Sequence, residues 1–410
     1  MNIILQLKLL NISAARPIAK HRLRTFIHAL QILRHMEFST RIIHEDNIKD
    51  GSGAVMSPII LSTTFERGED GISYPSGFFY SRYDNPNRHS LEQKLAKMEN
   101  GVGCVSFASG LAAATVVFQS LKTGDHIILP DDTYFSIRTI LDTMFSGFGL
   151  SYTLVDMTDH AALRKAIQPN TKLVWMETPS NPLIKVTDLA AVAAIAKEHN
   201  CFTVADNTWA TPYYTKPIEL GIDIVLHSTT KYLGGHSDIL GGALIFGENN
   251  QRYEFIKACQ RLGGAVPSPY DCWLLCRSLT TFTARMPIHS NNAMQLATYL
   301  EAHPKIERVL YPGLASHPQH EVATRQMRNG FGGMLSILVK GDRATALKLA
   351  DKLQLFTHAT SLGGVESLIE HRKSIEGDLS PTPDNLLRIS AGIEDVKDLI
   401  ADFEQALLSI

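Results

Sequence analysis

The sequence predicts an α/β protein: a mostly parallel sheet flanked by helices, followed by a smaller α+β domain. Between residues 103 and 246, short apolar runs alternate with runs of helical spacing, which is the order of a layered α/β domain. After about residue 283 the helical runs lengthen and strand-like runs become fewer, which indicates a second unit. A chain of 410 residues with 44% hydrophobic residues is long enough for two or three such units.

Seven apolar runs are expected to form buried strands, because strands covered on both faces read as continuous apolar stretches. They span residues 103–108, 125–130, 151–156, 172–177, 201–206, 223–228 and 241–246. Helices are expected at residues 109–122, 159–168, 188–200, 286–303, 344–353 and 395–409. This pattern divides the chain into a basic extension (1–36), an N-terminal arm (37–83), a sheet domain (84–282) and a C-terminal domain (283–410).

The first 36 residues differ in composition from the rest. They hold no acidic residue and six basic ones: Lys8, Arg16, Lys20, Arg22, Arg24 and Arg34. We interpret this extension as a tail, or as sequence upstream of a true start at Met36. An organelle transit peptide is the alternative, although such peptides are rich in serine and this segment has one.

Charge and cysteine content exclude several classes of protein. A net charge of −2 gives no general attraction to nucleic acid, and no apolar run is long enough to cross a bilayer. The five cysteines are scattered, with no CxxC pair, so we expect reduced thiols, a cytoplasmic location and no metal site. They are Cys104, Cys201, Cys259, Cys272 and Cys276.

The stretch "HSTTKYLGGHSD" (227–238) places Lys231 after three hydroxyl side chains and before two glycines. A Walker phosphate loop has its glycines before the lysine, so that interpretation fails. Asp206 ends an earlier apolar run, where a carboxylate is costly without a cationic partner. Ser109 and Gly110 separate a predicted strand from a predicted helix, so free backbone N–H groups are expected there. Taken singly, these residues also suit helix caps and turns.

Together these groups have the chemistry that pyridoxal phosphate (PLP) requires. The lysine amine bonds to the aldehyde, the helix N-terminus and hydroxyls hold the phosphate, and the carboxylate keeps the ring nitrogen protonated. A protonated ring is an electron sink, which makes carbanions at an amino acid's α-carbon accessible. Lys231, once free, is then placed to move a proton.

The chain resembles the Cys/Met-metabolism PLP enzymes, the transsulfuration family of cystathionine γ-synthases, γ-lyases, β-lyases and methionine γ-lyases. The resemblance covers about residue 39 to the C-terminus. Its motifs are "YSRYDNPNR", "ASGLAA", "DDTYFS", "ETPSNP", "VADNTWATP", "HSTTKYLGGHSD", "YPGLASHPQH", "SLGGVESLIEH" and "LLRISAGIEDVKDLIADFEQAL". It implies a fold-type I PLP-dependent transferase.

The resemblance also implies a set of roles. Lys231 is the lysine that bonds to PLP, Asp206 pairs with the ring nitrogen, and Tyr134 stacks on the ring and serves as acid or base. The phosphate is held by Ser228, Thr230, the backbone of Gly110 and Leu111, and Tyr80 and Arg82 of a neighbouring subunit. Asn181, Ser361 and Arg388 bind the substrate, and Glu366 meets its far end. A small amino-acid substrate and a homodimer or homotetramer with shared active sites follow.

We interpret the chain as a cystathionine γ-synthase or γ-lyase, with a cystathionine β-lyase or a methionine γ-lyase as the alternative, because three residues point to different reactions. Glu366 favours the γ-synthase and γ-lyase type, whereas Phe79 before Tyr80 resembles β-lyases, and Phe135 replaces a usual glycine after Tyr134. A PLP aminotransferase and a degenerate PLP-binding regulatory protein are remoter alternatives. "GVGCVS" lacks the third glycine of a dinucleotide loop, and "HPQHE" lacks the helical spacing of a zinc site.

Overall fold

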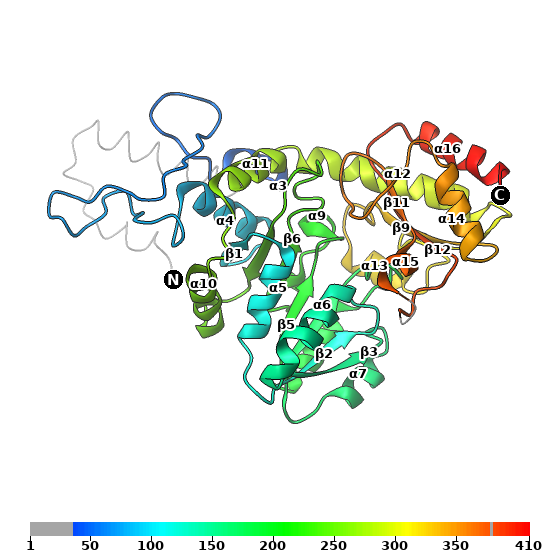
Figure 1. Cartoon of the computed structure of the whole chain (residues 1–410), viewed down its shortest axis with the longest axis horizontal. Coiled ribbons are helices and arrows are strands. Elements are labelled where there is room, and N and C mark those ends of the chain that lie inside the picture. Colours follow the sequence, from blue (N-terminus) through cyan, green and yellow to red (C-terminus); the bar gives the residue numbers. More distant parts are fainter. Residues whose placement is uncertain (1–35, 378–379) are drawn as a thin grey trace, which may run out of the picture. The chain divides into compact units, whose positions relative to one another are not determined.

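The computed structural model describes residues 36–377 and 380–410 (Figure 1). The chain divides into two compact units, Met1–Glu45 and Asp46–Ile410. The described part of the first unit holds helix α3 (Phe38–His44). The expectations for the basic extension fall, except for Met36, outside the described residues. Within the described ranges, no helix has the length and apolar character needed to span a bilayer.

A seven-stranded sheet forms the larger part of the second unit, in the order β1-β7-β6-β5-β4-β2-β3. Only β7 runs against its neighbours, so the prediction of a mostly parallel sheet is confirmed. The strands are β1 (Gly103–Phe107), β2 (His126–Pro130), β3 (Ser151–Val155), β4 (Thr171–Glu177), β5 (Phe202–Asp206), β6 (Ile224–Ser228) and β7 (Gly242–Phe246). Six of them lie within the apolar runs predicted as strands, and β4 begins one residue before its predicted run.

Helices cover both faces of this sheet. On one face α5 (Gly110–Gln119), α6 (Phe135–Ile140) and α10 (Gln251–Gly263) pack on a core that includes Phe107, Trp175 and Leu226. On the other, α7 (His160–Ala166) and α8 (Leu189–Glu198) pack on Val174 and Met176. The remaining elements of this domain are α4 (Pro86–Met98), η2 (Leu141–Phe145), η3 (Ser146–Phe148), α9 (Thr211–Tyr214), η4 (Pro217–Leu220) and α11 (Pro269–Leu279).

Capping side chains fix the starts of the helices. The hydroxyl of Ser109 accepts a hydrogen bond from the Ala112 N–H at 3.1 Å, and α5 begins at the next residue. Asp188 caps α8 in the same way, and Asn85 caps α4 with proline at its first position. Each cap satisfies a backbone N–H that the helix leaves unpaired.

A second sheet, of five strands, forms the C-terminal domain in the order β10-β11-β12-β9-β8. Its strands are β8 (Ile306–Leu310), β9 (Met334–Val339), β10 (Thr357–His358), β11 (Leu368–Glu370) and β12 (Leu386–Ser390). Its helices are α12 (Phe282–Glu301), α13 (His320–Gln326), α14 (Arg343–Lys352), α15 (Arg372–Glu376) and α16 (Val396–Leu408). The predicted α+β character is confirmed, and α12 starts beside the expected boundary at residue 283.

Residues 46–84, all described, contain no helix and no strand beyond one isolated bridge between Thr64 and Tyr80. Several large apolar side chains of this arm are exposed, among them Val55, Leu61 and Ile72. A segment of this kind gains little stability from the core of its own domain, because most of its apolar surface remains in water.

Candidate active site

A pocket of about 220 Å³ lies where β4, β5 and β6 end. Glu177, Asp206 and Ser228 are the last residues of these neighbouring parallel strands, and all three line the pocket. Their side chains meet because the carboxyl ends of parallel strands share one edge of the sheet. The C-terminal domain closes the pocket with Thr360, Ser361, Leu362, Arg372 and Arg388.

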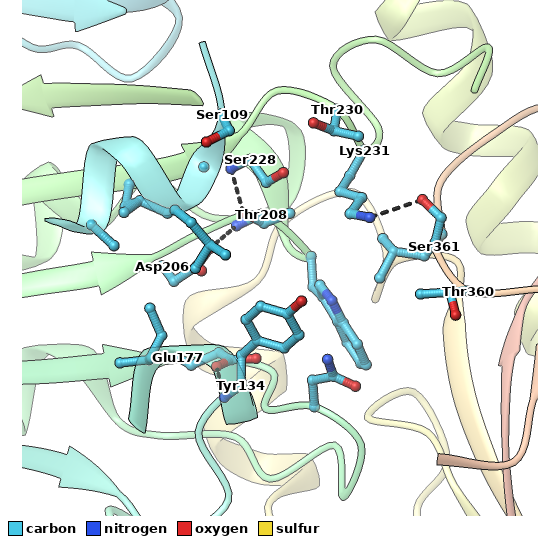
Figure 2. A pocket seen from close by; sticks show the side chains of 18 of the residues that line it. Ser109, Tyr134, Glu177, Asp206, Thr208, Ser228, Thr230, Lys231, Thr360 and Ser361 are labelled. Atoms are coloured by element: carbon cyan, nitrogen blue, oxygen red, sulfur yellow. Dashed lines mark hydrogen bonds between the residues drawn. The ribbon is translucent and has the colours of Figure 1, made fainter. Parts of the chain in front are cut away.

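Lys231 reaches into this pocket from the turn after β6. Its Nζ donates a hydrogen bond to Ser361 Oγ at 2.8 Å (Figure 2). Burial, reinforced by the positive charge of Arg388, lowers the pKa of Lys231 to about 8. A larger share of this amine is therefore neutral, and able to act as a nucleophile, than of an ordinary lysine.

Asp206 and Ser228 are joined through Thr208 (Figure 2). The Thr208 N–H donates to Asp206 Oδ1 at 3.0 Å, and the Ser228 N–H donates to Thr208 Oγ1 at 2.8 Å. Burial raises the pKa of Asp206, and the hydrogen bonds from Thr208 oppose that rise. A buried carboxylate of this kind is most stable beside a cation.

The N-terminus of α5 faces Ser228 across a narrow gap. A Cβ at Gly110 would lie 3.0 Å from Ser228 Cβ and 3.2 Å from Ser228 Oγ, so this close approach favours a glycine. Gly110, Leu111, Ser228 and Thr230 all line the pocket. Free backbone N–H groups, two hydroxyls and the positive end of the helix dipole could together hold a phosphate.

Tyr134 and Glu177 form the wall of the pocket opposite Ser228 (Figure 2). The Tyr134 N–H donates to Glu177 Oε2 at 2.8 Å, which fixes the tyrosine at the start of α6. Glu177 stands opposite Asp206 in the β4–β5 register. Burial and then the charge of Asp206 raise the pKa of Glu177 well above its usual value, so we assign the proton of this carboxylate pair to Glu177.

Arg388 projects from β12 and is buried. Its Nη1 donates to Asn181 Oδ1 at 3.2 Å, and its Nη2 donates to the Ser361 carbonyl at 2.9 Å. Ser361 has a φ of 113°, a strained conformation for a residue with a side chain. These contacts bring a guanidinium, an amide and a hydroxyl to one side of Lys231, in an arrangement that suits a carboxylate.

Most of the predicted site residues lie together in this pocket: Gly110, Leu111, Tyr134, Asn181, Asp206, Ser228, Thr230, Lys231, Ser361 and Arg388. Tyr80, Arg82 and Glu366 do not line it. Arg82 Nη1 donates to the Arg261 carbonyl at 2.7 Å, and Tyr80 is 42% exposed in the arm. Glu366 accepts a hydrogen bond from the Ser237 hydroxyl.

The sequence motifs did not point to four further residues in or beside the site: Glu177, Thr208, Glu370 and Arg372. Glu177 ends the run "KLVWME" as Asp206 ends "CFTVAD", so the position of a carboxylate at a strand end could have revealed it. Thr208 follows Asp206 by two residues, the usual spacing of a local side-chain turn. For Glu370 and Arg372 the sequence offers no comparable signal, because their pairing is set by the C-terminal sheet.

The donor set of the pocket fits PLP. Lys231 offers an amine of lowered pKa, and Asp206 a half-buried carboxylate that is held by the N–H of Thr208. Gly110 and Leu111 at the start of α5 line the pocket with Ser228 and Thr230, so backbone N–H groups and hydroxyls are available to a phosphate. When bound, PLP supplies an electron sink for a carbanion next to an amino group.

Comparison with known proteins agrees with this chemistry. The model of the Cys/Met metabolism PLP-dependent enzyme family matches residues 39–408. The chain belongs to this family. It is accordingly a PLP-dependent transsulfuration enzyme, a carbon–sulfur lyase or γ-replacement transferase, and PLP is its cofactor, as predicted.

The chain is similar to members of the Cys/Met metabolism family that have different names. It is 46% identical to a cystathionine β-lyase of Coxiella burnetii, over 90% of this chain and 97% of the relative. It is 45% identical to a cystathionine γ-synthase of Mycobacterium bovis, over 90% and 96%. The crystal structure of a cystathionine γ-lyase from Lactobacillus plantarum, complexed with L-serine, is 39% identical with a TM-score of 0.86, over 92% and 99%.

Proposed function

We propose that this enzyme is of the cystathionine γ-synthase or γ-lyase type and acts on a sulfur amino acid or an activated homoserine. The observation that carries the proposal is the position of Glu366. Its carboxylate accepts a hydrogen bond from Ser237, so it joins the loop that follows Lys231 to the segment that follows Ser361. Other residues of these two segments line the pocket, so Glu366 is held beside the pocket and not in its wall. An acid there suits a substrate that extends beyond the pocket and has a second ammonium at its far end.

We propose that the residues around PLP divide the work as follows. Lys231 bonds to the cofactor and, once released by the incoming amino group, moves protons beside the α-carbon; its lowered pKa suits both tasks. Asp206 keeps the ring nitrogen protonated. Tyr134 stacks on the ring and serves as an acid or base near the leaving group.

In this proposal, two sides of the pocket bind anionic groups: one binds the phosphate of PLP and the other the α-carboxylate of the substrate. Ser228, Thr230 and the backbone N–H groups of Gly110 and Leu111 hold the phosphate, with the helix dipole of α5 in support. Arg388 binds the α-carboxylate of the substrate with its planar guanidinium. Asn181 and Ser361 position this guanidinium and the substrate.

We propose a homodimer or homotetramer with shared sites, in which Tyr80 and Arg82 complete the phosphate site of a neighbouring subunit. Two observations support it: neither residue lines the pocket of its own chain, and their arm exposes much apolar surface. Arg82→Ala and Lys231→Ala chains, nearly inactive alone, should regain up to about half of wild-type activity per heterodimer, because one site then carries neither lesion. Inactive mixed oligomers, verified by mass measurement, would contradict sharing.

Steady-state assays test the reaction type. The purified enzyme is given cystathionine, methionine, or O-succinyl- or O-acetylhomoserine with cysteine. The proposal expects 2-oxobutanoate from cystathionine, or cystathionine from the homoserine ester. Pyruvate as the main product from cystathionine would overturn it in favour of a β-lyase, and amino transfer without ammonia release would indicate an aminotransferase. Absence of any turnover with bound PLP would indicate a regulatory protein.

The β-lyase is the second candidate. Phe79, an apolar residue before Tyr80, and the 46% identity to the Coxiella burnetii protein favour it.

We also propose a cytoplasmic location, because all five cysteines are free thiols, as expected in a reducing compartment. Fractionation of cells that express the full chain would test it.

A further inference from the structure

A second guanidinium, that of Arg372, lines the pocket beside Arg388, and the proposed roles make no use of it. Arg372 is the first residue of α15 and is 1% exposed. Its Nη2 donates to Glu376 Oε1 at 2.9 Å, and its Nη1 donates to Glu370 Oε2 at 3.0 Å. A buried arginine with two carboxylate partners is a fixed element of the pocket wall.

Arg372 and Arg388 bind the same oxygen atom. Arg388 Nη2 donates to Glu370 Oε2 at 2.5 Å, while the Thr360 hydroxyl donates to Glu370 Oε1 at 2.7 Å. Burial alone would raise the pKa of Glu370, but Arg388 and Arg372 hold it below its usual value, so this carboxylate is charged. The charges therefore alternate along a chain that runs from Arg388 through Glu370 and Arg372 to Glu376.

This sharing affects what Arg388 can offer to a ligand. If Glu370 had Arg388 as its sole cationic partner, the carboxylate would offset the charge of Arg388 and weaken its attraction for a second carboxylate. With Arg372 on the same oxygen, the negative charge of Glu370 is divided between two cations. Because the groups are buried, water and salt screen these interactions poorly. Glu370 is also held by three hydrogen bonds, which fixes the plane of the Arg388 fork.

We infer that Arg372 is a positioning residue for amino-acid recognition: by sharing Glu370, it keeps the Arg388 guanidinium oriented toward, and attractive to, the ligand's α-carboxylate. The inference rests on the proposed role of Arg388. It predicts an effect confined to ligands that carry that carboxylate. A residue that only supported the fold would affect ligands with and without a carboxylate alike.

The test compares two ligands that differ only in that group, L-norleucine and pentylamine. Their dissociation constants are measured from the absorbance change of the PLP-loaded enzyme. In wild type, norleucine should bind more tightly. In Arg372→Met, this preference should fall about tenfold or more, while the constant for pentylamine changes less than about twofold. Arg372→Lys should restore part of the preference, and Arg328→Met, at a site 67% exposed, should leave it unchanged.

The outcomes separate this inference from the proposal beneath it. If Arg372→Met weakens both ligands equally or leaves the preference intact, while Arg388→Met abolishes the preference, the inference is overturned and the role of Arg388 stands. If Arg388→Met leaves the preference unchanged, the proposed carboxylate site is wrong. Arg372→Met leaves the negative charge of Glu376 without its arginine partner. The double variant Arg372→Met/Glu376→Gln, which removes that charge, is therefore measured too. The inference expects the same loss of preference in it.

Discussion

The half of the pocket on the ends of β4, β5 and β6 contrasts with the half that the C-terminal domain supplies. In the first, Asp206 and Ser228 end adjacent strands, and backbone N–H donors join both to Thr208 in the turn after β5. In the second, Arg388 depends on side chains, among them Asn181, which is 207 residues away in the chain. The first half suits a cofactor and the second a substrate.

The two halves should therefore respond differently to mutation. Backbone register holds the cofactor half, so a side chain can be replaced there with little effect on its neighbours. The substrate half is held by buried ion pairs, in which removal of one charge leaves another uncompensated. Changes in the first half should therefore affect chemistry more than binding, and changes in the second should affect binding more than chemistry.

Lys231→Ala should have the largest effect. Turnover should fall by about a thousandfold or more, because the variant lacks the group that we propose as both covalent anchor and proton carrier. Cofactor binding, measured by equilibrium dialysis, should weaken yet remain detectable, because the phosphate and ring contacts persist. Borohydride treatment of the wild-type holoenzyme should fix PLP to a peptide that contains Lys231, and a label on another lysine would refute this assignment. Lys348→Ala, on the exposed side of α14, is the control.

Asp206→Asn keeps the shape of the side chain and removes its charge. The maximal rate of the PLP-saturated enzyme should fall about a hundredfold, since a neutral partner no longer stabilises the protonated ring. The dissociation constant for PLP should change less than about tenfold. An unchanged saturated rate with weakened PLP binding would show that Asp206 acts by binding alone. Asp159→Asn, at the exposed cap of α7, is the matched control.

The pKa of Lys231, about 8, sets a pH dependence for cofactor capture by the PLP-free protein. Only the neutral amine attacks the aldehyde, and the pKa is lowered, so the neutral fraction increases as pH rises toward 8. The rate of capture, followed by stopped-flow absorbance, should rise about fiftyfold between pH 6 and pH 8 and then level off. A rate that continues to rise up to pH 10 would mean an ordinary lysine.

Arg388→Lys should have the smallest of these effects. It keeps the charge and removes the planar fork, so KM for the amino-acid substrate should rise about tenfold while kcat changes by a smaller factor. Initial rates over a range of substrate concentrations separate the two parameters. A fall in kcat at constant KM would place Arg388 in the chemical step and remove the contrast between the two halves. Arg328→Lys serves as the exposed control.

The sequence was enough to predict the fold class, the seven strands of the large sheet and ten of the residues that line the pocket. Strands buried on both faces leave continuous apolar runs, and polar residues where those runs end, such as Asp206 and Ser228, stand out against them. Lys231 was recognisable because glycines and hydroxyls surround it within twelve residues. The many family motifs in order placed Tyr134, Asn181, Ser361 and Arg388.

Only the tertiary structure revealed the network behind Arg388. Glu370 and Arg372 lie two residues apart, yet nothing in "LIEHRKSI" indicates that both are buried or that Glu370 also binds Arg388. Pairing of β11 with β12, which places Glu370 opposite Arg388, decides this. The tertiary structure also showed that Tyr80 and Arg82 lie outside the pocket of their own chain. Local sequence records which side chains are available, but the partner of a buried charge depends on segments that only folding brings together.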